Sequence, residues 1–230
     1  MATFLGSKEV SLKSVGGLNN AYKLKLELYL NSQDTTYNRS NVTLKAFMCA
    51  YSGWGFSGYS QPKVTGTING NQKFQNTVSS IMSTSYVEVG SWTGNINHNE
   101  DGKLTILATV SFSPNRSDVS YLPASGSVSE TKSLPDIPRA SICSFPGHQM
   151  GDNFRINTNR ASSSFTHNLT IYVNNTQILT RSGIGDYVDI IPTPSEKQLM
   201  HESSPNNIFA TMKVKCETYN GATKIGETNT

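Results

Sequence analysis

The sequence predicts an all-β protein made of two antiparallel β-sandwiches in tandem. Three observations support this fold class. Apolar and polar residues alternate over several short segments, Asn-Gly and similar turn signals separate those segments, and charged residues make up only 15% of the 230 residues. Soluble domains usually carry about 25% charged residues. Because Ser, Thr, Asn and Gly fill the polar positions instead, strands and turns are favoured over long surface helices.

The first half contains three segments with the two-residue period of a half-buried strand. Apolar residues occupy alternate positions in residues 22–30, 42–51 and 104–112. Residues 86–92 predict a shorter strand. Asn69-Gly70 and residues 100–102 predict tight turns, because Gly supplies the positive φ that such turns require. Short strands separated by these turns predict a β-sandwich, for which we prefer jelly-roll-like connectivity.

A domain boundary is predicted at Pro135 and Pro138, since two nearby prolines remove hydrogen-bond donors and fix an extended backbone. The first domain then covers residues 1–134 and the second residues 135–230. The second is predicted to be an immunoglobulin-like β-sandwich that serves as a spacer. Its strand-like segments are residues 154–156, 165–173 and 208–219.

The end of the second domain has weaker signals. Residues 194–201 predict a short helical turn, because Pro194 opens the segment and Ser195-Glu196 suit a first turn. Asn220-Gly221 predicts a turn into residues 224–230, which lack the apolar alternation of a convincing final strand.

Charge and targeting signals exclude several classes of protein. The formal net charge of +3 is too small for a dedicated nucleic-acid face. The N-terminus lacks the basic and apolar regions of a signal peptide, and no stretch approaches about 18 consecutive apolar residues. We therefore expect a protein that is made in a cytoplasm and has no membrane partner. Cys49, Cys143 and Cys216 are expected to be free buried thiols, with a Cys143–Cys216 bridge left open.

The residues do not predict catalysis, a metal site or a cofactor. The four histidines are scattered, and His167 alternates with apolar residues, which predicts a core histidine. No serine lies in a G-x-S-x-G elbow. Residues 97–102 resemble the opening of a calcium loop, but Ala108 stands where a bidentate Glu is required, so we expect a turn. A glycosidase remains open because two facing carboxylates suffice, and the first domain offers Glu88, Glu100, Asp101 and Asp118.

The most unusual composition lies in residues 51–61, where four aromatic residues alternate with glycines and hydroxyl residues. An aromatic loop at the rim of a sandwich can stack its rings on the apolar faces of sugars. The candidate carbohydrate-binding residues are Tyr51, Trp54, Phe56 and Tyr59. Packing into the core and contact with a neighbouring subunit are the alternatives. No Lys or Arg is interleaved, which argues against single-stranded nucleic acid.

From about Ser127 onward, the chain resembles the repeated domains of minor structural proteins from the tails of siphoviruses that infect Gram-positive bacteria. The resemblance lies in the order and spacing of residues 130–141, 160–170 and 216–226. Residues 90–92 followed by 96–103 are similar to a turn common in tail and baseplate proteins, which is a weaker signal.

The resemblance implies a virion component at the tail tip or baseplate, made in the host cytoplasm and assembled with other phage tail proteins. It implies contact with the host surface and no catalytic motif. Phage fibres are usually homotrimers, so a trimer is the favoured oligomer. Neutral, hydroxyl-rich sandwiches suit recognition of host cell-wall polysaccharide, because many weak contacts gain strength when several copies bind together. The alternatives are a wall-degrading glycosidase and a tail-assembly component without a ligand.

Overall fold

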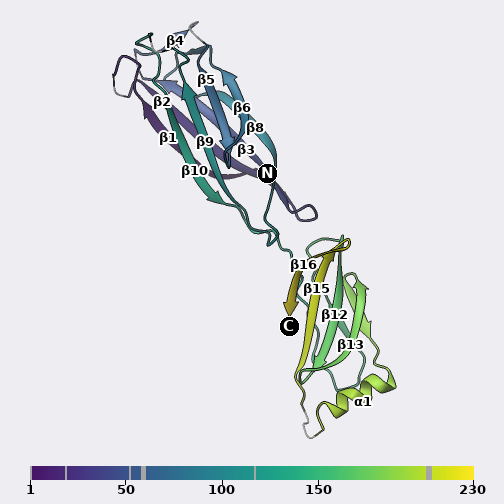
Figure 1. Cartoon of the computed structure of the whole chain (residues 1–230). Helices are drawn as coiled ribbons and strands as arrows, with labels where there is room; N and C mark the ends of the chain where they lie inside the picture. The colour runs from purple at the N-terminus through teal and green to yellow at the C-terminus, as the bar shows by residue number, and fades with distance from the viewer. Residues whose placement is uncertain (1, 19, 52, 58–60, 117, 206–208) are drawn as a thin grey trace. The chain divides into compact units, whose positions relative to one another are not determined.

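The computed structural model describes the chain except residues 1, 19, 52, 58–60, 117 and 206–208 (Figure 1). The chain forms two compact units. The first unit consists of Met1–Asp34, Arg39–His98 and Lys103–Asp136, and the second of Thr35–Asn38, Asn99–Gly102 and Ile137–Thr230.

The first unit has two four-stranded antiparallel sheets. One sheet has the order β1 (Thr3–Leu12), β2 (Tyr22–Asp34), β3 (Arg39–Ala50) and β8 (Val87–Asn97). The other has the order β10 (Gly126–Ser133), β9 (Thr105–Ser113), β5 (Lys63–Ile68) and β6 (Asn71–Thr77). A short pair, β4 (Phe56–Ser57) and β7 (Ser80–Ile81), forms a two-stranded sheet of its own.

Buried side chains from both four-stranded sheets form a single hydrophobic core. Leu24, Leu26 and Leu28 of β2 are fully buried, as are Ile106 and Val110 of β9. Burying one such side chain contributes roughly 1.5–3 kcal/mol. The strands predicted from the two-residue period are therefore confirmed. The Asn69-Gly70 turn between β5 and β6 is confirmed too, with φ of 50° and 77° at its two residues.

The predicted jelly-roll connectivity is not confirmed. β1, β2 and β3 follow one another as neighbours in one sheet, in a three-stranded meander. The chain then forms the β5–β6 hairpin in the second sheet before β8 returns beside β3. β1 was missed by sequence analysis because most of its side chains are exposed, so it lacks an apolar alternation.

The second unit contains a four-stranded antiparallel sheet and a two-stranded sheet. The larger has the order β13 (Thr176–Ile184), β12 (Phe165–Val173), β15 (Met212–Asn220) and β16 (Thr223–Asn229). The smaller pairs β11 (Phe154–Asn157) with β14 (Tyr187–Ile190). Leu169, Ile171 and Val214 of the larger sheet are fully buried in the core of the second unit. Antiparallel sheets are as predicted, but the immunoglobulin-like assignment is not confirmed.

The predicted helical turn is the helix α1 (Pro194–Glu202), whose Met200 is buried in the core. Thr193 and Glu196 form a capping box at its start, which explains why the helix begins there. The expectation for residues 224–230 was wrong, because β16 forms there as an edge strand. β16 carries charged side chains instead of apolar ones, and two of them, Lys224 and Glu227, form ion pairs with β15. The strand therefore has no hydrophobic pattern by which it could be predicted.

Candidate functional site

A hollow of about 320 Å³ lies at one end of the sheet that contains β2 and β3. It is lined by Lys23, Cys49, Ala50, Tyr51, Thr84 and Tyr86. We call it the Tyr51 hollow. Two backbone hydrogen bonds assemble it, from Tyr51 N to Ala21 O at 3.0 Å and from Ala50 N to Ser83 O at 2.9 Å. These bonds bring the residue after β3 beside the start of β2 and the segment before β8.

The polar groups beside the hollow are paired with one another. Glu9 accepts hydrogen bonds from Lys23 Nζ at 2.7 Å and from the Tyr86 hydroxyl at 2.5 Å. The hydrogen bond from Lys23 lowers the pKa of Glu9, which is therefore ionised at neutral pH. Burial, followed by the hydrogen bond to Glu9, raises the pKa of Tyr86, so its phenol stays neutral. The ring of Tyr86 also lies 4.9 Å from Lys25 Nζ, within cation–π range.

The chemistry of these groups suits binding. Burial raises the pKa of Cys49, so the thiol is protonated and not a ready nucleophile. Of the carboxylates considered for glycoside hydrolysis, Glu88 has its pKa lowered by a hydrogen bond from Lys45, and Asp118 by one from Arg116. A general acid needs a raised pKa. Neither Glu88 nor Asp118 therefore has the environment of a general acid.

The four candidate carbohydrate-binding residues have different environments. Tyr51 is 44% exposed and lines the hollow. Trp54 is half-buried and packs against the core of the first unit. Phe56 is 2% exposed and packs between Tyr22 and Phe112, with ring centroids 6.0 Å and 6.5 Å away.

The prediction that Phe56 contacts a sugar is therefore wrong. Its backbone pairs with Ile81 in the β4–β7 pair, and this pairing turns the ring into the core. Tyr59 lies outside the described residues. Sequence reasoning missed Tyr86, Lys23 and Thr84. The alternation that predicted the first strand did place Lys23 on its outward side, but nothing in a single sequence indicates that Tyr86 meets it.

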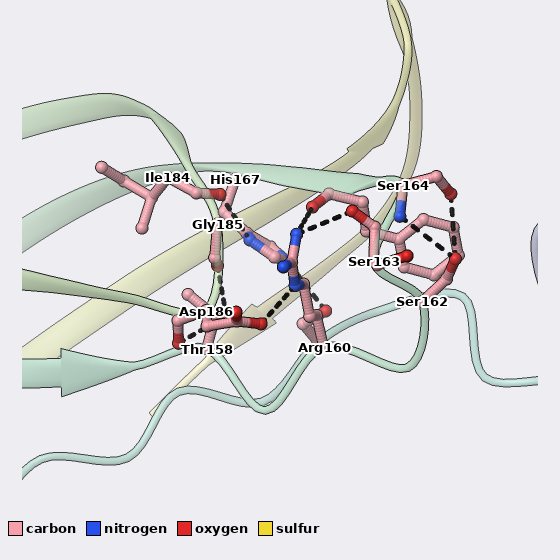
Figure 2. Close-up of polar contacts among 11 residues, drawn as sticks. Thr158, Arg160, Ser162, Ser163, Ser164, His167, Ile184, Gly185 and Asp186 are labelled. Carbon is pink, nitrogen blue, oxygen red and sulfur yellow. Dashed lines mark hydrogen bonds and ion pairs between the residues drawn. The ribbon is translucent and has the colours of Figure 1, made fainter.

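A second polar cluster lies in the second unit around Arg160, and Figure 2 shows it in close-up. The guanidinium donates from Nε to Asp186 Oδ1 at 2.5 Å, and from Nη1 to the carbonyls of Ser163 at 2.8 Å and Phe165 at 3.2 Å. Thr158 Oγ1 donates to the carbonyl of Gly185 at 2.7 Å. These bonds hold the segment before β12 against the β13–β14 connection. The donors of this cluster are directed at the protein's own carbonyls and at the Asp186 carboxylate. We therefore assign the cluster a structural role.

His167 is confirmed as a core histidine. It is fully buried, its Nδ1 donates to the Ile184 carbonyl at 3.0 Å, and its Nε2 accepts from the Ser141 hydroxyl at 2.8 Å. Burial lowers its pKa, so the ring is neutral at pH 7.

In the described part of the chain, no group of three or more His, Cys, Asp or Glu side chains could hold a metal ion. Within the same residues, no helix is long and apolar enough to cross a membrane.

Cys143 and Cys216 are both buried in the second unit and are free thiols. Their side chains are hydrogen-bonded to each other, and this bond together with burial raises the pKa of Cys143. The expectation of free buried thiols is confirmed for this pair, and Cys49 is likewise buried and free.

Comparison with known families gives one match over most of the chain. A family described as "Siphovirus protein of unknown function (DUF859)" matches residues 17–230. No curated protein matches the chain.

Two solved structures show a weak likeness. One is the central fibronectin-III array of RIM-binding protein, with 12% identity over 87% of this chain and 65% of that chain, at a TM-score of 0.23. The other, from Bacteroides fragilis, is assigned as a beta-galactosidase, with 10% identity over 96% of this chain and 33% of that chain, at a TM-score of 0.19. The chain thus spans about 65% and 33% of their lengths, and the TM-scores are too low to imply a shared fold.

Proposed function

The chain belongs to this family of siphovirus proteins of unknown function, and we propose that it is a structural protein of the phage tail that contributes to recognition of the host surface. The proposed place is the tail tip or baseplate, beside other tail proteins. The proposed host is a Gram-positive bacterium, because the segments from Ser127 onward resemble tail proteins of phages that infect such bacteria. The proposed ligand is the cell-wall polysaccharide.

The observation that carries the binding role is the Tyr51 hollow. It combines two tyrosine rings, Tyr51 and Tyr86, with the hydroxyl of Thr84 and the ammonium of Lys23 around a volume of about 320 Å³. Sugars are bound by this combination, because rings stack on their apolar faces while polar groups meet their hydroxyls. A single shallow hollow binds weakly, so we propose that several copies act together on one polymer.

We propose binding in preference to hydrolysis. The carboxylate beside the hollow, Glu9, is held ionised by Lys23. A glycosidase needs a second carboxyl group whose pKa is raised, and Glu88 lies beside Lys45, which lowers its pKa instead.

The experiment is adsorption of purified protein to whole host cells, followed by centrifugation. The double variant Tyr51→Ala/Tyr86→Ala is compared with Tyr187→Ala, since Tyr187 is an exposed tyrosine of the second unit that lies against Arg155. Retention of the wild-type protein and of Tyr187→Ala, with loss of the double variant, is the expected result. If the wild-type protein is not retained on host cells, the recognition role is excluded and a tail-assembly role is left.

A further inference from the structure

The Tyr51 hollow is one end of a longer outward surface on the sheet β1-β2-β3-β8. Along β2 and β3, every second side chain is buried in the core, and the side chains between them point outward. The outward residues of β2 are Lys23, Lys25, Glu27, Tyr29 and Asn31, and those of β3 are Asn41, Thr43, Lys45 and Phe47. Cys49 follows the same alternation but is buried where it lines the Tyr51 hollow. We call this surface the outer face.

One end of the outer face is a hydrogen-bonded array of uncharged groups. Asn31 Nδ2 donates to Asn41 Oδ1 at 2.8 Å and to Thr43 Oγ1 at 2.9 Å. Asn41 Nδ2 donates to Asn95 Oδ1 at 2.8 Å, and the hydroxyls of Thr43 and Thr93 lie 2.7 Å apart. The array therefore crosses three strands and fixes the directions of its amides and hydroxyls. Such groups are complementary to sugar hydroxyls and carry no charge.

Aromatic rings accompany these polar groups. Phe4 and Tyr29 pack together with ring centroids 5.4 Å apart, next to the uncharged array. Nearer the hollow, the rings of Phe47 and Tyr86 both lie within 6 Å of Lys25 Nζ, at 5.6 Å and 4.9 Å. The rings are thus distributed along the strands. This arrangement provides several stacking positions for one extended chain.

The charges on the outer face cancel in pairs. Lys23 pairs with Glu9 at 2.7 Å, Lys25 with Glu27 at 2.5 Å, and Lys45 with Glu88 at 2.8 Å. These are the only lysines of β2 and β3, both of which lie wholly within the described residues. An anionic polymer such as a phosphate-linked teichoic acid is recognised by cations that are free to pair with it. On the outer face, an anionic polymer would have to displace the three carboxylates that are paired with these lysines.

We infer that the outer face binds a neutral polysaccharide that lies along β2 and β3, from the Tyr51 hollow to the uncharged array. This inference rests on the proposed function and names the chemical class of its ligand. The distance from Cys49 to Asn41 along β3 is about 27 Å at roughly 3.4 Å per residue, enough for several sugar units. The balanced charges disfavour the anionic polymers of the same cell wall.

The test uses two polymers from the host wall, the neutral polysaccharide fraction and polyglycerol-phosphate teichoic acid, each immobilised. Binding of the full chain is measured at about 50 mM and about 500 mM NaCl, a range over which exposed charges become strongly screened. We expect retention on the neutral polymer that changes less than about twofold with salt, and little retention on the teichoic acid at either concentration.

A matched pair of variants locates the site. Thr43→Val removes a hydroxyl from the uncharged array but keeps a β-branched side chain on its strand. Thr109→Val is the control, because Thr109 of β9 makes an equivalent pair with Ser129 at 2.8 Å on the other sheet. We expect Thr43→Val to weaken binding to the neutral polymer at least about fivefold, and Thr109→Val to change it less than about twofold.

The possible outcomes separate the two proposals. Salt-sensitive binding to teichoic acid alone overturns the neutral-ligand inference and leaves host recognition standing. Equal effects of Thr43→Val and Thr109→Val overturn the outer face as the site. If neither polymer nor whole cells retain the wild-type protein, host recognition itself fails. Because the salt comparison uses the wild-type protein, it decides the ligand class even if a variant does not fold.

Discussion

The hydroxyl of Tyr86 donates a 2.5 Å hydrogen bond to Oε2 of Glu9, and this bond joins the segment before β8 to β1. The other carboxylate oxygen of Glu9 accepts from Lys23 of β2. The segment before β8 therefore meets two strands from the start of the chain, β1 and β2, at one carboxylate. As a result, the ring of Tyr86 is held in the wall of the Tyr51 hollow, where we propose that it contacts a sugar.

If the ring of Tyr86 carries the sugar contact, Tyr86→Phe should keep most of the binding, within about threefold. The lost hydrogen bond is largely exposed to solvent, so the free energy of unfolding should fall by less than about 1 kcal/mol. Tyr86→Ala should lose the stacking surface and reduce binding more than about tenfold. Retention on host cells and urea denaturation measure the two effects. Equal loss in both variants would indicate that the hydroxyl, and not the ring, carries the contact.

Phe56 and Tyr51 should respond in opposite ways to truncation, although both belong to the same aromatic segment. Phe56→Ala removes a buried ring from the core and should cost about 3–5 kcal/mol of the free energy of unfolding. Tyr51→Ala removes an exposed ring and should cost less than about 0.5 kcal/mol, but weaken adsorption to host cells. Urea denaturation of both variants checks the difference. A similar loss of stability in Tyr51→Ala would show that the Tyr51 ring packs in the core.

The stability of the second unit should depend on the protonation of His167. Its pKa in the folded protein is lowered from the ordinary value of 6.5 by burial, while backbone hydrogen bonds and the nearby charges of Asp186 and Arg160 have smaller effects. The unfolded chain takes up the proton near pH 6.5 and the folded chain only at lower pH. The stabilisation from the neutral ring is therefore present above pH 6.5 and is lost as the pH falls toward the folded pKa.

Hydrogen exchange of β12 and β15 at pH 7.5 and 5.5, corrected for the intrinsic exchange rate, measures this effect. Protection should fall at the lower pH by at most about 1.4 kcal/mol per pH unit. His167→Gln should remove the pH dependence in this window. Glu196 and Glu217 are carboxylates whose pKa is lowered in the folded protein, so their contribution to its stability is lost only as the pH falls below their ordinary value of 4.5. They therefore do not affect the comparison between pH 7.5 and 5.5. Unchanged protection in the wild-type protein would contradict the neutral buried ring.

The sequence predicts the strands whose inner faces are apolar, because burial imposes the two-residue period directly. Leu24, Leu26 and Leu28 follow that period, and Asn69-Gly70 adopts the positive φ that its residue types favour. The start of α1 was likewise visible in Pro194 and Glu196. Two strands at sheet edges, β1 and β16, were not predicted, since charged and polar side chains stabilise them without an apolar period.

The candidate site was only partly predictable, because its contacts join distant parts of the chain. The aromatic and glycine-rich composition identified Tyr51, but it included Phe56 equally, and only the pairing of β4 with β7 separates the two. Tyr86 meets Glu9 across 77 positions in the sequence. Strand order determines such a contact, and a single sequence does not reveal strand order.

Arg160→Lys should destabilise the second unit, because an ammonium cannot reproduce the fork that reaches Asp186 and the carbonyls of Ser163 and Phe165. We expect a loss of about 1–2 kcal/mol in the free energy of unfolding. Arg155→Lys is the control. Arg155 makes a bidentate pair with Asp189 and lies over Tyr187, but the pair is about half exposed, so we expect a smaller loss than in Arg160→Lys. Equal midpoints of urea denaturation for the two variants would exclude a structural role for the Arg160 cluster.

The three thiols should be protected from reagents in the folded protein. Cys49, Cys143 and Cys216 are all buried, and burial raises the pKa of Cys49. An aromatic disulfide reagent should react with less than about one thiol per chain at pH 8 without denaturant, and with all three in urea. Fast reaction of Cys143 or Cys216 in the native protein would contradict the buried thiol pair.

The most direct test of host recognition is competition. Labelled wild-type protein is bound to host cells, and the purified neutral wall polysaccharide of the same host is added in increasing amounts. We predict that the polysaccharide displaces the protein from the cells, whereas teichoic acid at the same mass concentration does not. Binding that persists in excess polysaccharide would contradict the claim that this polymer is the ligand of the outer face.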